Sequence, residues 1–330
     1  MLSVGIIGVG HLGSIHARLW KDQPHVRCAG VFDTNHDAAS AKAAELGLNL
    51  FATIQECIDT CDLVTIAVPT SLHEQVALQC IEAGKHCLIE KPLAHSVEAG
   101  ERILQAAKLR GVRVQVGHVE RFNPALRTAM EFGLDPHFIE AHRLSRFRPR
   151  ATDVSVIHDL MIHDIDIVLS LVDSPLRSVS ANGVCVLTET VDLVHARLEF
   201  ENGTVANLNA SRLSATPMRK MRMFQKGMYL SLDFAKPGLD VFRILPPGSN
   251  SVSSHSIPAE MLGEIHAAAD KPNIVFEQPV VEQRNAIADE QAAFVDAVIH
   301  NSPLGVSGDD ALRALRVACT LEELVESSRR

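Results

Sequence analysis

A glycine-rich turn near the start of the chain constrains the fold more than any other feature of the sequence. The apolar segment Ser3–Ile7 has the composition of a buried strand, and Gly8-Val9-Gly10-His11-Leu12-Gly13 follows it directly. A helical segment, Ser14–Trp20, comes next. In this context the first glycine forms the turn, the second admits a pyrophosphate, and the third lets the helix pack closely on the strand. The sequence therefore predicts a dinucleotide site where this helix begins.

Asp33 indicates which dinucleotide binds. It stands twenty residues after Gly13, at the end of the predicted strand Val26–Phe32. A carboxylate here accepts hydrogen bonds from the ribose hydroxyls and repels a 2′-phosphate, and Thr34-Asn35 provides no arginine to bind one. We therefore expect NAD rather than NADP. The residues expected to contact it in this region are Gly8, Gly10, His11, Leu12, Gly13, Asp33 and Thr34.

Strands and helices alternate through the first 120 residues. Further strands are predicted over Leu63–Val68, His86–Ile89 and Arg113–Val116, with helices over Ala38–Leu46, Leu72–Ala83 and Val97–Leu109. Such βα units form a parallel sheet with helices on both faces. Residues 1–120 are therefore predicted to be an α/β domain of the Rossmann type.

The pattern changes after residue 120. Helices are predicted over Pro124–Phe132 and Val154–Val172, and Asn202-Gly203 suits the positive φ angles of a tight hairpin turn. The predicted strands are Arg177–Leu187, Leu193–Phe200, Thr204–Leu213, Arg219–Gln225, Tyr229–Phe234 and Leu239–Leu245. Two terminal helices follow, Ala286–His300 and Asp309–Val325. We expect residues 121–330 to form an α+β domain with a large, mostly antiparallel open sheet, whose C-terminal helices could return to the first domain.

Charge and composition exclude several classes of protein. The formal net charge of −9 argues against a general nucleic-acid surface. Polar or charged residues interrupt every apolar run before it could span a membrane, and the chain begins with a strand in place of a signal peptide. Cys57 and Cys61 have no second Cys/His pair at zinc spacing, so we expect no metal. Together these features indicate a cytoplasmic enzyme.

Two further strand ends carry residues suited to a ligand cleft, because ligands bind at the carboxyl ends of strands in open α/β sheets. Pro69 and Thr70 follow one strand, and His73 begins the next helix, where it either touches the cofactor or caps its own helix. Glu90-Lys91-Pro92 follows another strand. We expect Pro69, Thr70, His73, Glu90 and Lys91 to border the cofactor. Lys91, held by the fixed φ of the following proline, could activate a substrate hydroxyl. The alternative is an exposed lysine in a helix-capping loop.

A polar stripe follows the long helix predicted over Val154–Val172. Asp159, His163, Asp166 and Ser170 lie on one face, and most other positions are apolar. A histidine flanked by aspartates on a mostly buried helix suits a general base that is oriented by a carboxylate. The alternative is an amphipathic helix with an ordinary solvent face, which accounts well for Asp164 and poorly for the rest.

Arginines cluster just before this helix, at positions Arg143, Arg146, Arg148 and Arg150. Guanidinium groups suit a diphosphate. The alternatives are a solvated strand whose arginines pair with local acids, or an oligomer contact. A second basic group is expected to be structural or to lie at a subunit contact, and consists of Arg212, Arg219, Lys220 and Arg222.

The combination of Gly8–Gly13, Glu90-Lys91-Pro92 and Asp159-x-x-x-His163 resembles the glucose-fructose oxidoreductase / inositol dehydrogenase (Gfo/Idh/MocA) family over the whole chain. The resemblance implies a Rossmann domain followed by an α/β domain whose sheet commonly forms oligomer contacts, hence a homodimer or homotetramer. It implies that Lys91 and His163 meet at the substrate carbinol with Asp159 beside them. His163 would take the hydroxyl proton while hydride leaves for the nicotinamide, and Lys91 would stabilise the developing alkoxide.

Two segments, Val116–Pro124 and Asp159–Asp166, further resemble the branch of this family that oxidises UDP-N-acetylglucosamine at C3. That branch serves lipopolysaccharide amino-sugar synthesis beside an aminotransferase. The substrate-binding residues expected on this basis are Lys91, Arg121, Asn123, Arg148, Arg150, Asp159 and His163. Two alternatives are a dehydrogenase of a free polyol or sugar and a non-catalytic, NAD-sensing regulatory protein. The second predicts loss of Lys91 or His163, and both are present.

Overall fold

The computed structural model describes residues 1–147, 154–245, 259–265 and 273–328. The chain divides into two compact units, the first made of Met1–Val119 with Asn285–Arg316 and the second of Glu120–Arg284 with Val317–Arg330. Within the described ranges, no helix is both long and apolar enough to cross a membrane.

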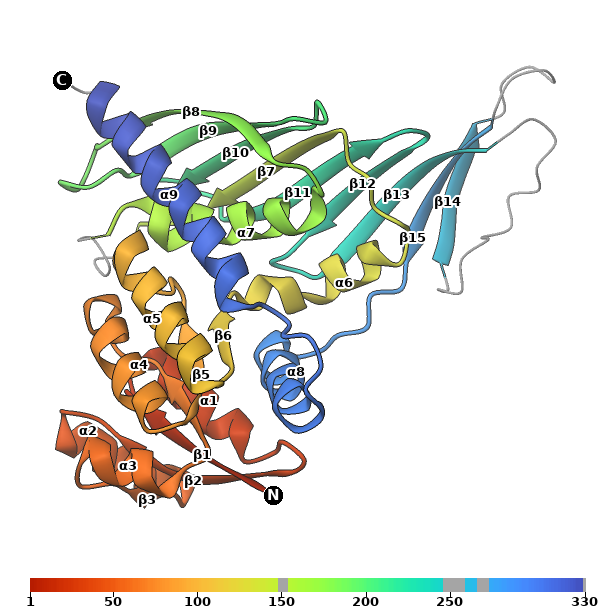
Figure 1. Cartoon of the computed structure of the whole chain (residues 1–330). Coiled ribbons are helices and arrows are strands. Elements are labelled where there is room, and N and C mark those ends of the chain that lie inside the picture. The colour runs from red at the N-terminus through yellow and green to blue at the C-terminus, as the bar shows by residue number, and fades with distance from the viewer. Residues whose placement is uncertain (148–153, 246–258, 266–272, 329–330) are drawn as a thin grey trace. The chain divides into compact units, whose positions relative to one another are not determined.

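The first unit is built on a six-stranded parallel sheet with the order β3-β2-β1-β4-β5-β6 (Figure 1). Its strands are β1 (Leu2–Ile7), β2 (Val26–Phe32), β3 (Asn49–Leu50), β4 (Leu63–Ile66), β5 (His86–Glu90) and β6 (Val114–Gly117). Its helices are α1 (His11–Trp20), α2 (His36–Leu46), α3 (Ile54–Thr60), α4 (His73–Glu82), α5 (Val97–Arg110) and α8 (Ala286–His300). The strand order reverses at β1, which lies between β2 and β4, and sheets of this kind bind ligands at that point. The predicted fold class is confirmed.

Capping residues set the limits of several helices in the first unit. The side chains of Asn35, Thr53 and Ser96 accept backbone N–H groups at the starts of α2, α3 and α5. Gly47 and Gly111 follow α2 and α5 with a φ of 64°, the left-handed conformation that commonly ends a helix. Local chemistry therefore accounts for the limits of α2 and α5, which the sequence predicts closely, and for the start of α3, which it does not predict.

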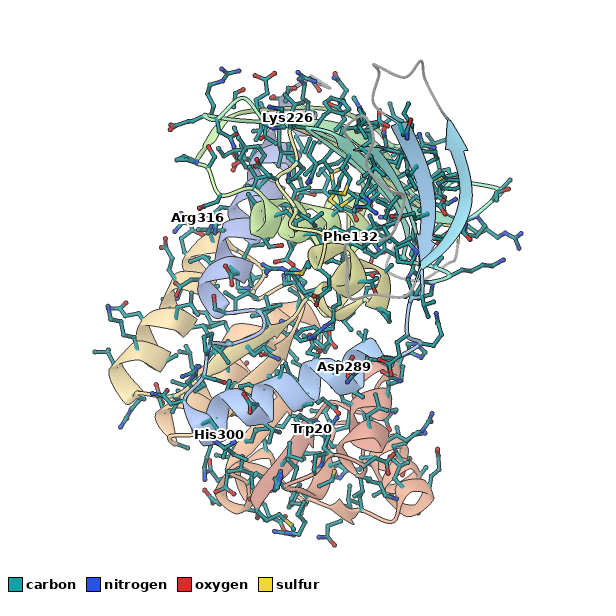
Figure 2. All side chains as sticks on the ribbon, turned by 90° about the vertical axis from the view of Figure 1, so that its right-hand side faces the viewer. Trp20, Phe132, Lys226, Asp289, His300 and Arg316 are labelled. Carbon is teal, nitrogen blue, oxygen red and sulfur yellow. The ribbon has the colours of Figure 1, made fainter. Side chains whose placement is uncertain are left out.

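The core of the first unit joins its N-terminal strands to the late helix α8. Trp20 is fully buried, donates its Nε1–H to Thr65 Oγ1 at 2.8 Å, and shares one apolar cluster with Phe294 of α8. Figure 2 shows Trp20 beside α8, which runs from near Asp289 to His300. Because this helix fills part of the core, it belongs to the first unit although it follows the second in sequence.

The second unit is built on a nine-stranded sheet with the order β14-β15-β13-β12-β11-β7-β10-β9-β8 (Figure 1). Its strands are β7 (Phe138–Leu144), β8 (Leu176–Val184), β9 (Leu193–Phe200), β10 (Val205–Ser211), β11 (Met218–Gln225), β12 (Met228–Asp233), β13 (Gly238–Leu245), β14 (Ala259–Ile265) and β15 (Asn273–Pro279). Only β7 and β10 pair in parallel among these neighbours. Helices α6 (Pro124–Met130) and α7 (Ile162–Leu171) pack on the sheet, and α9 (Gly308–Ser328) is the last described element.

Some elements differ from the sequence prediction. No strand is predicted at β3, β7, β14 or β15, and no helix at α3. In β7 the inward positions Ile139 and Ala141 are followed by Arg143, whose charge hides the apolar alternation of a central strand. The helix predicted over Val154–Val172 begins instead with a π-helical turn, Ile157–Met161, before α7. A π-helical turn shifts the helix faces, so the predicted polar stripe changes as well.

Candidate active site

The glycine turn has the geometry of a dinucleotide cradle. Gly8 has a φ of +94°, and a Cβ there would lie 2.5 Å from the carbonyl oxygen of Ala67. A Cβ on Gly13 would lie 1.9 Å from the carbonyl oxygen of Gly8, so only glycine lets α1 pack this closely. A Cβ on Gly10 would meet no described heavy atom within 4 Å. The turn is therefore closed at two glycines and open at the third, directly before α1, as a bound pyrophosphate requires.

Asp33 is fixed at the end of β2 by two backbone groups. Its Oδ2 accepts the N–H of Val9 at 2.7 Å, and its Oδ1 accepts the N–H of Asn35 at 2.9 Å. The side chain stays half-buried. Each carboxylate oxygen can accept a further hydrogen bond, so the group can still receive ribose hydroxyls. His11, Leu12 and Thr34, also expected at the cofactor, are exposed.

We expect Asp33→Asn to weaken NAD binding and to relax discrimination against NADP. The amide oxygen can still accept one backbone N–H, but the negative charge that repels a 2′-phosphate is gone. Titrating both cofactors into wild type, Asp33→Asn and Asp33→Ser gives the two dissociation constants for each. Asp33→Ser removes the charge and also both carboxylate oxygens that accept the backbone N–H groups of Val9 and Asn35. Comparing it with Asp33→Asn separates the effect of the lost charge from the effect of a loosened turn. An unchanged NAD:NADP preference in Asp33→Asn would contradict the assigned role.

His73 ties together two turns at the carboxyl ends of β4 and β5. Its ring is buried, Nδ1 lies 2.9 Å from the carbonyl oxygen of Pro92, and Nε2 lies 3.0 Å from that of Val68. It does not cap α4, which was one of its two predicted roles, since α4 has no side-chain cap. Burial lowers the pKa of His73, and the two carbonyl acceptors act in the opposite direction. Pro69 is exposed and Thr70 half-buried on the turn that His73 holds.

Glu90 is buried and hydrogen-bonded to α1. Its Oε1 lies 2.8 Å from His16 Nε2, and its Oε2 accepts the backbone N–H of Lys91 at 3.1 Å. The Lys91–Pro92 peptide bond is cis, and the Lys91 side chain is half-buried. The helix-capping alternative for this tripeptide is wrong, because Ser96 caps α5. The structure therefore presents Lys91 from a turn that a buried carboxylate supports.

Two residues beside Glu90 were not predicted. His16 lies on the inner face of α1 and Gln291 on α8, and both are buried. The Gln291 amide nitrogen lies 3.1 Å from His16 Nδ1. A buried polar group needs a partner, so a polar residue on the apolar face of a predicted helix was the signal that could have indicated them.

Asp159 and His163 lie on either side of a change in helix type. Asp159 belongs to the π-helical turn, and His163 to the first turn of α7. Both side chains are half-buried. The predicted stripe does not continue beyond them, because Asp166 is buried, whereas Ser170 is exposed and donates to the carbonyl of Ile167. Single π-helical turns occur frequently at functional sites, which fits the predicted role of this pair.

Two arginine–aspartate pairs hold α7 in place. Arg121 donates Nε–H and Nη2–H to Asp166 at 2.7 and 3.0 Å. Arg143 of β7 donates Nε–H and Nη2–H to Asp164 at 3.0 and 2.8 Å, and Nη1–H to Glu120 at 2.7 Å. Such two-point contacts fix orientation as well as distance. The helix that carries His163 is therefore braced by two charged pairs, at the positions one and three residues after His163.

Asp164 and Arg143 correct two predictions. Asp164, expected on a solvent face, is 3% exposed, and Arg143, considered as a diphosphate ligand, is also 3% exposed. Burial disfavours the charge of Arg143, but Asp164 and Glu120 together raise its pKa. Burial raises the pKa of Asp164, although Arg143 opposes the shift. The physical reason is that a buried guanidinium needs carboxylate partners, and these occupy its donors.

Other predicted substrate residues have partners within the second unit. Asn123 caps α6 by accepting the N–H of Ala125 at 3.1 Å, and its amide donates to Glu120 and to the carbonyl of Phe234. Arg146 donates to the carbonyl of Ala215. The roles of Arg121 and Asn123 at the substrate stay predictions. Arg148 and Arg150 lie outside the described residues.

The second basic group pairs with local acids, as one of its two predicted roles requires. The pairs are Arg212–Asp192 at 3.6 Å, Arg219–Glu120 at 3.7 Å, Lys220–Asp233 at 3.7 Å and Arg222–Glu140 at 3.8 Å. Among the residues that the structure describes, no group of three or more His, Cys, Asp or Glu side chains could hold a metal ion.

Models of two protein domains match this chain. That of the oxidoreductase family with an NAD-binding Rossmann fold matches residues 2–118. That of the GFO/IDH/MocA C-terminal domain matches residues 125–228. The first unit thus contains the NAD-binding domain of an oxidoreductase. The chain belongs to the Gfo/Idh/MocA family, as its motifs predict.

The similarity to one enzyme covers nearly all of both chains. UDP-N-acetylglucosamine 3-dehydrogenase from Acidithiobacillus ferrooxidans is 35% identical over 327 residues, 99% of this chain and 98% of that protein. A solved structure of that enzyme has a TM-score of 0.88 at 34% identity and covers 99% of this chain and 98% of its own. Inositol 2-dehydrogenase from Cereibacter sphaeroides is 34% identical over 181 residues, 52% of this chain and 54% of that protein.

Proposed function

We propose that this oxidoreductase oxidises UDP-N-acetylglucosamine at C3 to the 3-keto sugar, with NAD as hydride acceptor. The observation that carries the proposal is the similarity to an enzyme of that activity along the whole length of both chains. The chain itself supports it with Lys91 at the end of β5 and with Asp159 and His163 at the start of α7.

Three residues have separate roles in the reaction. His163 accepts the proton of the C3 hydroxyl as the carbonyl forms. Lys91 donates a hydrogen bond to the same oxygen and stabilises its developing negative charge. Asp159, four residues before His163, orients the imidazole and stabilises the charge that it gains. NAD, when bound, would supply the hydride acceptor for C3, so that the alcohol loses two electrons and two hydrogens in all.

The remaining site residues bind and orient the two ligands. The open glycine turn and Asp33 hold the cofactor at the pyrophosphate and the ribose. Arg148 and Arg150 are proposed to contact the diphosphate of the sugar nucleotide, with Arg121 and Asn123 near the substrate. The braces Arg121–Asp166 and Arg143–Asp164 keep His163 in place while the substrate is exchanged.

UDP should compete with the sugar substrate, because a diphosphate site binds the nucleotide without the sugar. The assay follows NAD reduction with UDP-N-acetylglucosamine, myo-inositol and glucose, with an aminotransferase present to remove the ketone. Arg148→Ala or Arg150→Ala should raise the KM for the UDP-sugar by about one to two decades and leave that for NAD nearly unchanged. Turnover of myo-inositol that UDP does not inhibit would instead favour a free polyol as substrate.

The two rival functions have less support. The inositol 2-dehydrogenase similarities cover 52 to 63% of this chain, and a neutral polyol offers no partner for arginines. A non-catalytic NAD sensor has no use for Lys91 or His163, which the chain retains. The same substrate screen decides between all three functions, since a sensor would reduce no NAD with any substrate.

We further propose that the product passes to an aminotransferase in lipopolysaccharide amino-sugar synthesis. An aminotransferase converts a ketone to an amine. Removal of the ketone shifts the equilibrium of the oxidation toward product. The seven cysteines are all reduced thiols, which suits a reducing compartment such as the cytoplasm.

We also propose that the sheet of the second unit mediates homo-oligomerisation. Five aromatic rings cross neighbouring strands in one row, with centroids 4.3 to 5.9 Å apart. The row consists of Phe138, Phe224, Tyr229, Phe242 and Phe276. Along the strands, the residues of this row alternate with buried residues such as Met223 and Leu230. The row therefore lies on the face of the sheet opposite to the buried one. Phe224 is 38% exposed, and exposed aromatic groups are enriched at protein interfaces.

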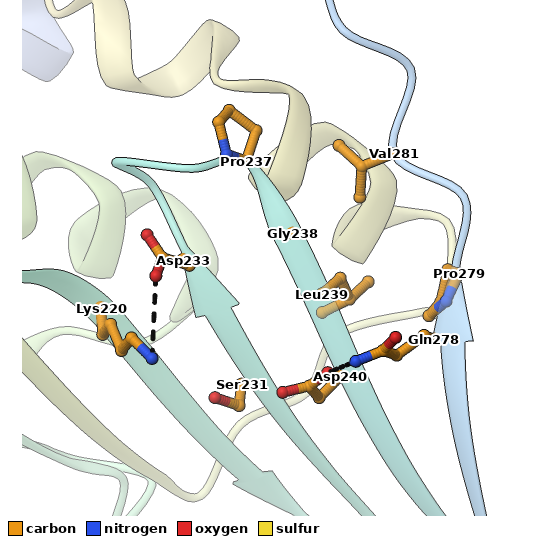
Figure 3. A pocket seen from close by; sticks show the side chains of 10 residues that line it. All are labelled: Lys220, Ser231, Asp233, Pro237, Gly238, Leu239, Asp240, Gln278, Pro279 and Val281. Carbon is orange, nitrogen blue, oxygen red and sulfur yellow. Dashed lines mark hydrogen bonds and ion pairs between the residues drawn. The ribbon is translucent and has the colours of Figure 1, made fainter. Parts of the chain in front are cut away.

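A polar hollow of about 320 Å³ (Figure 3) lies further along the same strands than this aromatic row. Lys220 pairs there with Asp233, and Gln278 donates to Asp240 at 2.8 Å. Ser231 is two residues from Tyr229 on β12 and therefore shares its face. An apolar centre with a polar margin is the usual composition of an interface. A second copy of the chain presents the same row, so two copies can pack about a twofold axis.

Phe224→Asp should therefore shift the protein to a smaller oligomer. A buried carboxylate without a partner opposes packing of the two aromatic rows. Leu109→Asp is the matched control, since Leu109 is 79% exposed on α5 of the first unit. Light scattering after size-exclusion chromatography measures the mass of each variant. An unchanged mass for Phe224→Asp would place the subunit contact elsewhere.

A further inference from the structure

We infer that His16 is a positioning residue for Lys91, and that Gln291 sets the orientation of the His16 ring. Gln291 is hydrogen-bonded to His16, His16 to Glu90, and Glu90 to the Lys91 backbone, and all four residues belong to the first unit. The inference rests on the proposed function of Lys91 at the reacting oxygen. It adds a residue of the cofactor helix α1 and a residue of α8 to the support of the catalytic lysine.

The hydrogen bonds of Gln291 determine which nitrogen of His16 carries the proton. The amide nitrogen of Gln291 lies 3.1 Å from His16 Nδ1 and 3.2 Å from the His16 carbonyl oxygen. An amide nitrogen only donates, so Nδ1 is the acceptor and the neutral ring has its proton on Nε2. Gln23 supports this orientation of the amide by pointing its own Nε2 at Gln291 Oε1, at 3.5 Å. His16 Nε2–H therefore donates to Glu90.

Glu90 transmits this constraint to Lys91. Its Oε1 receives the His16 proton donor at 2.8 Å, and its Oε2 receives the backbone N–H of Lys91 at 3.1 Å. Glycine at position 117 makes room for the carboxylate, since a Cβ there would lie only 2.9 Å from Oε2. Burial disfavours the charge of Glu90, but His16 and Lys91 outweigh it and lower its pKa. Glu90 is therefore an ionised, two-sided acceptor between α1 and the lysine turn.

Loss of the His16 donor would release one side of this carboxylate. A buried carboxylate with one donor fewer either takes up a proton or turns toward another partner. Both changes alter the hydrogen bond to the Lys91 backbone and the charge next to its ammonium group. His16 is hydrogen-bonded to Glu90, and Gln291 is hydrogen-bonded to His16, so we expect the effect of both residues on turnover to pass through Glu90.

The matched variants are His16→Leu and His16→Gln. Leucine fills similar space without a donor, whereas the Nε2 of glutamine can replace the histidine donor to Glu90. We expect His16→Leu to lower kcat by roughly 10- to 100-fold, with little change in the KM for the sugar or the Kd for NAD. His16→Gln should recover most of the activity, and Gln291→Met should give a smaller loss of the same kind. Equal losses in both His16 variants, or parallel losses in kcat and NAD affinity, would overturn the inference.

A spectroscopic measurement separates this inference from the proposed function. Reductive ¹³C-methylation of the lysines gives NMR signals, and Lys91→Arg identifies the signal of Lys91. We expect this signal to shift in His16→Leu and to stay near its wild-type position in His16→Gln. A shifted Lys91 signal in an enzyme that does not oxidise the UDP-sugar would refute the proposed function and leave the positioning role standing. An unshifted signal in a folded His16→Leu protein would refute the positioning role alone.

Discussion

Lys91→Met or His163→Ala should lower kcat by about 10²–10⁴-fold and leave the affinity for NAD near that of the wild type. Both groups are proposed to act at the carbon–oxygen bond that is oxidised, whereas the glycine turn and Asp33 are proposed to hold the cofactor. Stopped-flow or steady-state NAD reduction measures kcat, and fluorescence titration measures the cofactor affinity. The two variants should therefore bind NAD and fail to reduce it.

Matched controls and pH sharpen this test. Lys108→Met and His195→Ala remove the same side-chain types from exposed positions on α5 and β9 and should retain turnover. In the wild type, kcat/KM should rise with pH as His163 loses its proton, because only a neutral imidazole accepts one. His163→Ala should lack this rise. Near wild-type kcat in His163→Ala would refute its role as base, and collapse of NAD affinity with activity would make either residue structural.

Short-range chemistry makes the glycine turn of the candidate cofactor site predictable from sequence. The glycine turn spans six residues, and its strand–turn–helix context specifies a role for each glycine, which the clashes at Gly8 and Gly13 support. Asp33 could be singled out because it ends the next strand along the chain. The same holds for Lys91, whose position follows from where β5 ends.

The supporting contacts could not be predicted because their partners are far apart in sequence. His16 contacts Glu90 across 74 positions and Gln291 across 275. Arg143 was assigned to a charge cluster by its neighbours in sequence, yet its partners come from η2 (Val119–Phe122) and from α7. The π-helical turn at Ile157–Met161 was also hidden, because the sequence there has the apolar spacing of an ordinary helix. Residue type alone does not reveal which distant carboxylate neutralises a given arginine.

Arg143→Met should destabilise the second unit by about 3–5 kcal/mol. The change removes the cation from a buried group in which Glu120 and Asp164 accept its hydrogen bonds and are little exposed. Urea unfolding followed by circular dichroism measures the loss. Arg222→Met is the matched control on the neighbouring strand β11, since the Arg222 side chain is 49% exposed, and should cost no more than about 0.5 kcal/mol.

Protonation should relieve the defect in Arg143→Met. Burial already raises the pKa of Asp164 in the wild type, and Arg143 opposes that shift, so removing the arginine raises the folded-state pKa further. A carboxyl group with a raised folded-state pKa stabilises the fold at low pH and loses that contribution as pH rises through this pKa. The stability gap between wild type and Arg143→Met should therefore be smaller near pH 4 than at neutral pH.

Adding Glu120→Gln and Asp164→Asn to Arg143→Met should also narrow the stability gap at neutral pH, because no buried charge is then left without a partner. A gap that stays constant with pH and in the triple variant would mean that Arg143 stabilises the second unit by packing, through contacts such as that of its guanidinium with the Phe234 ring 5.9 Å away.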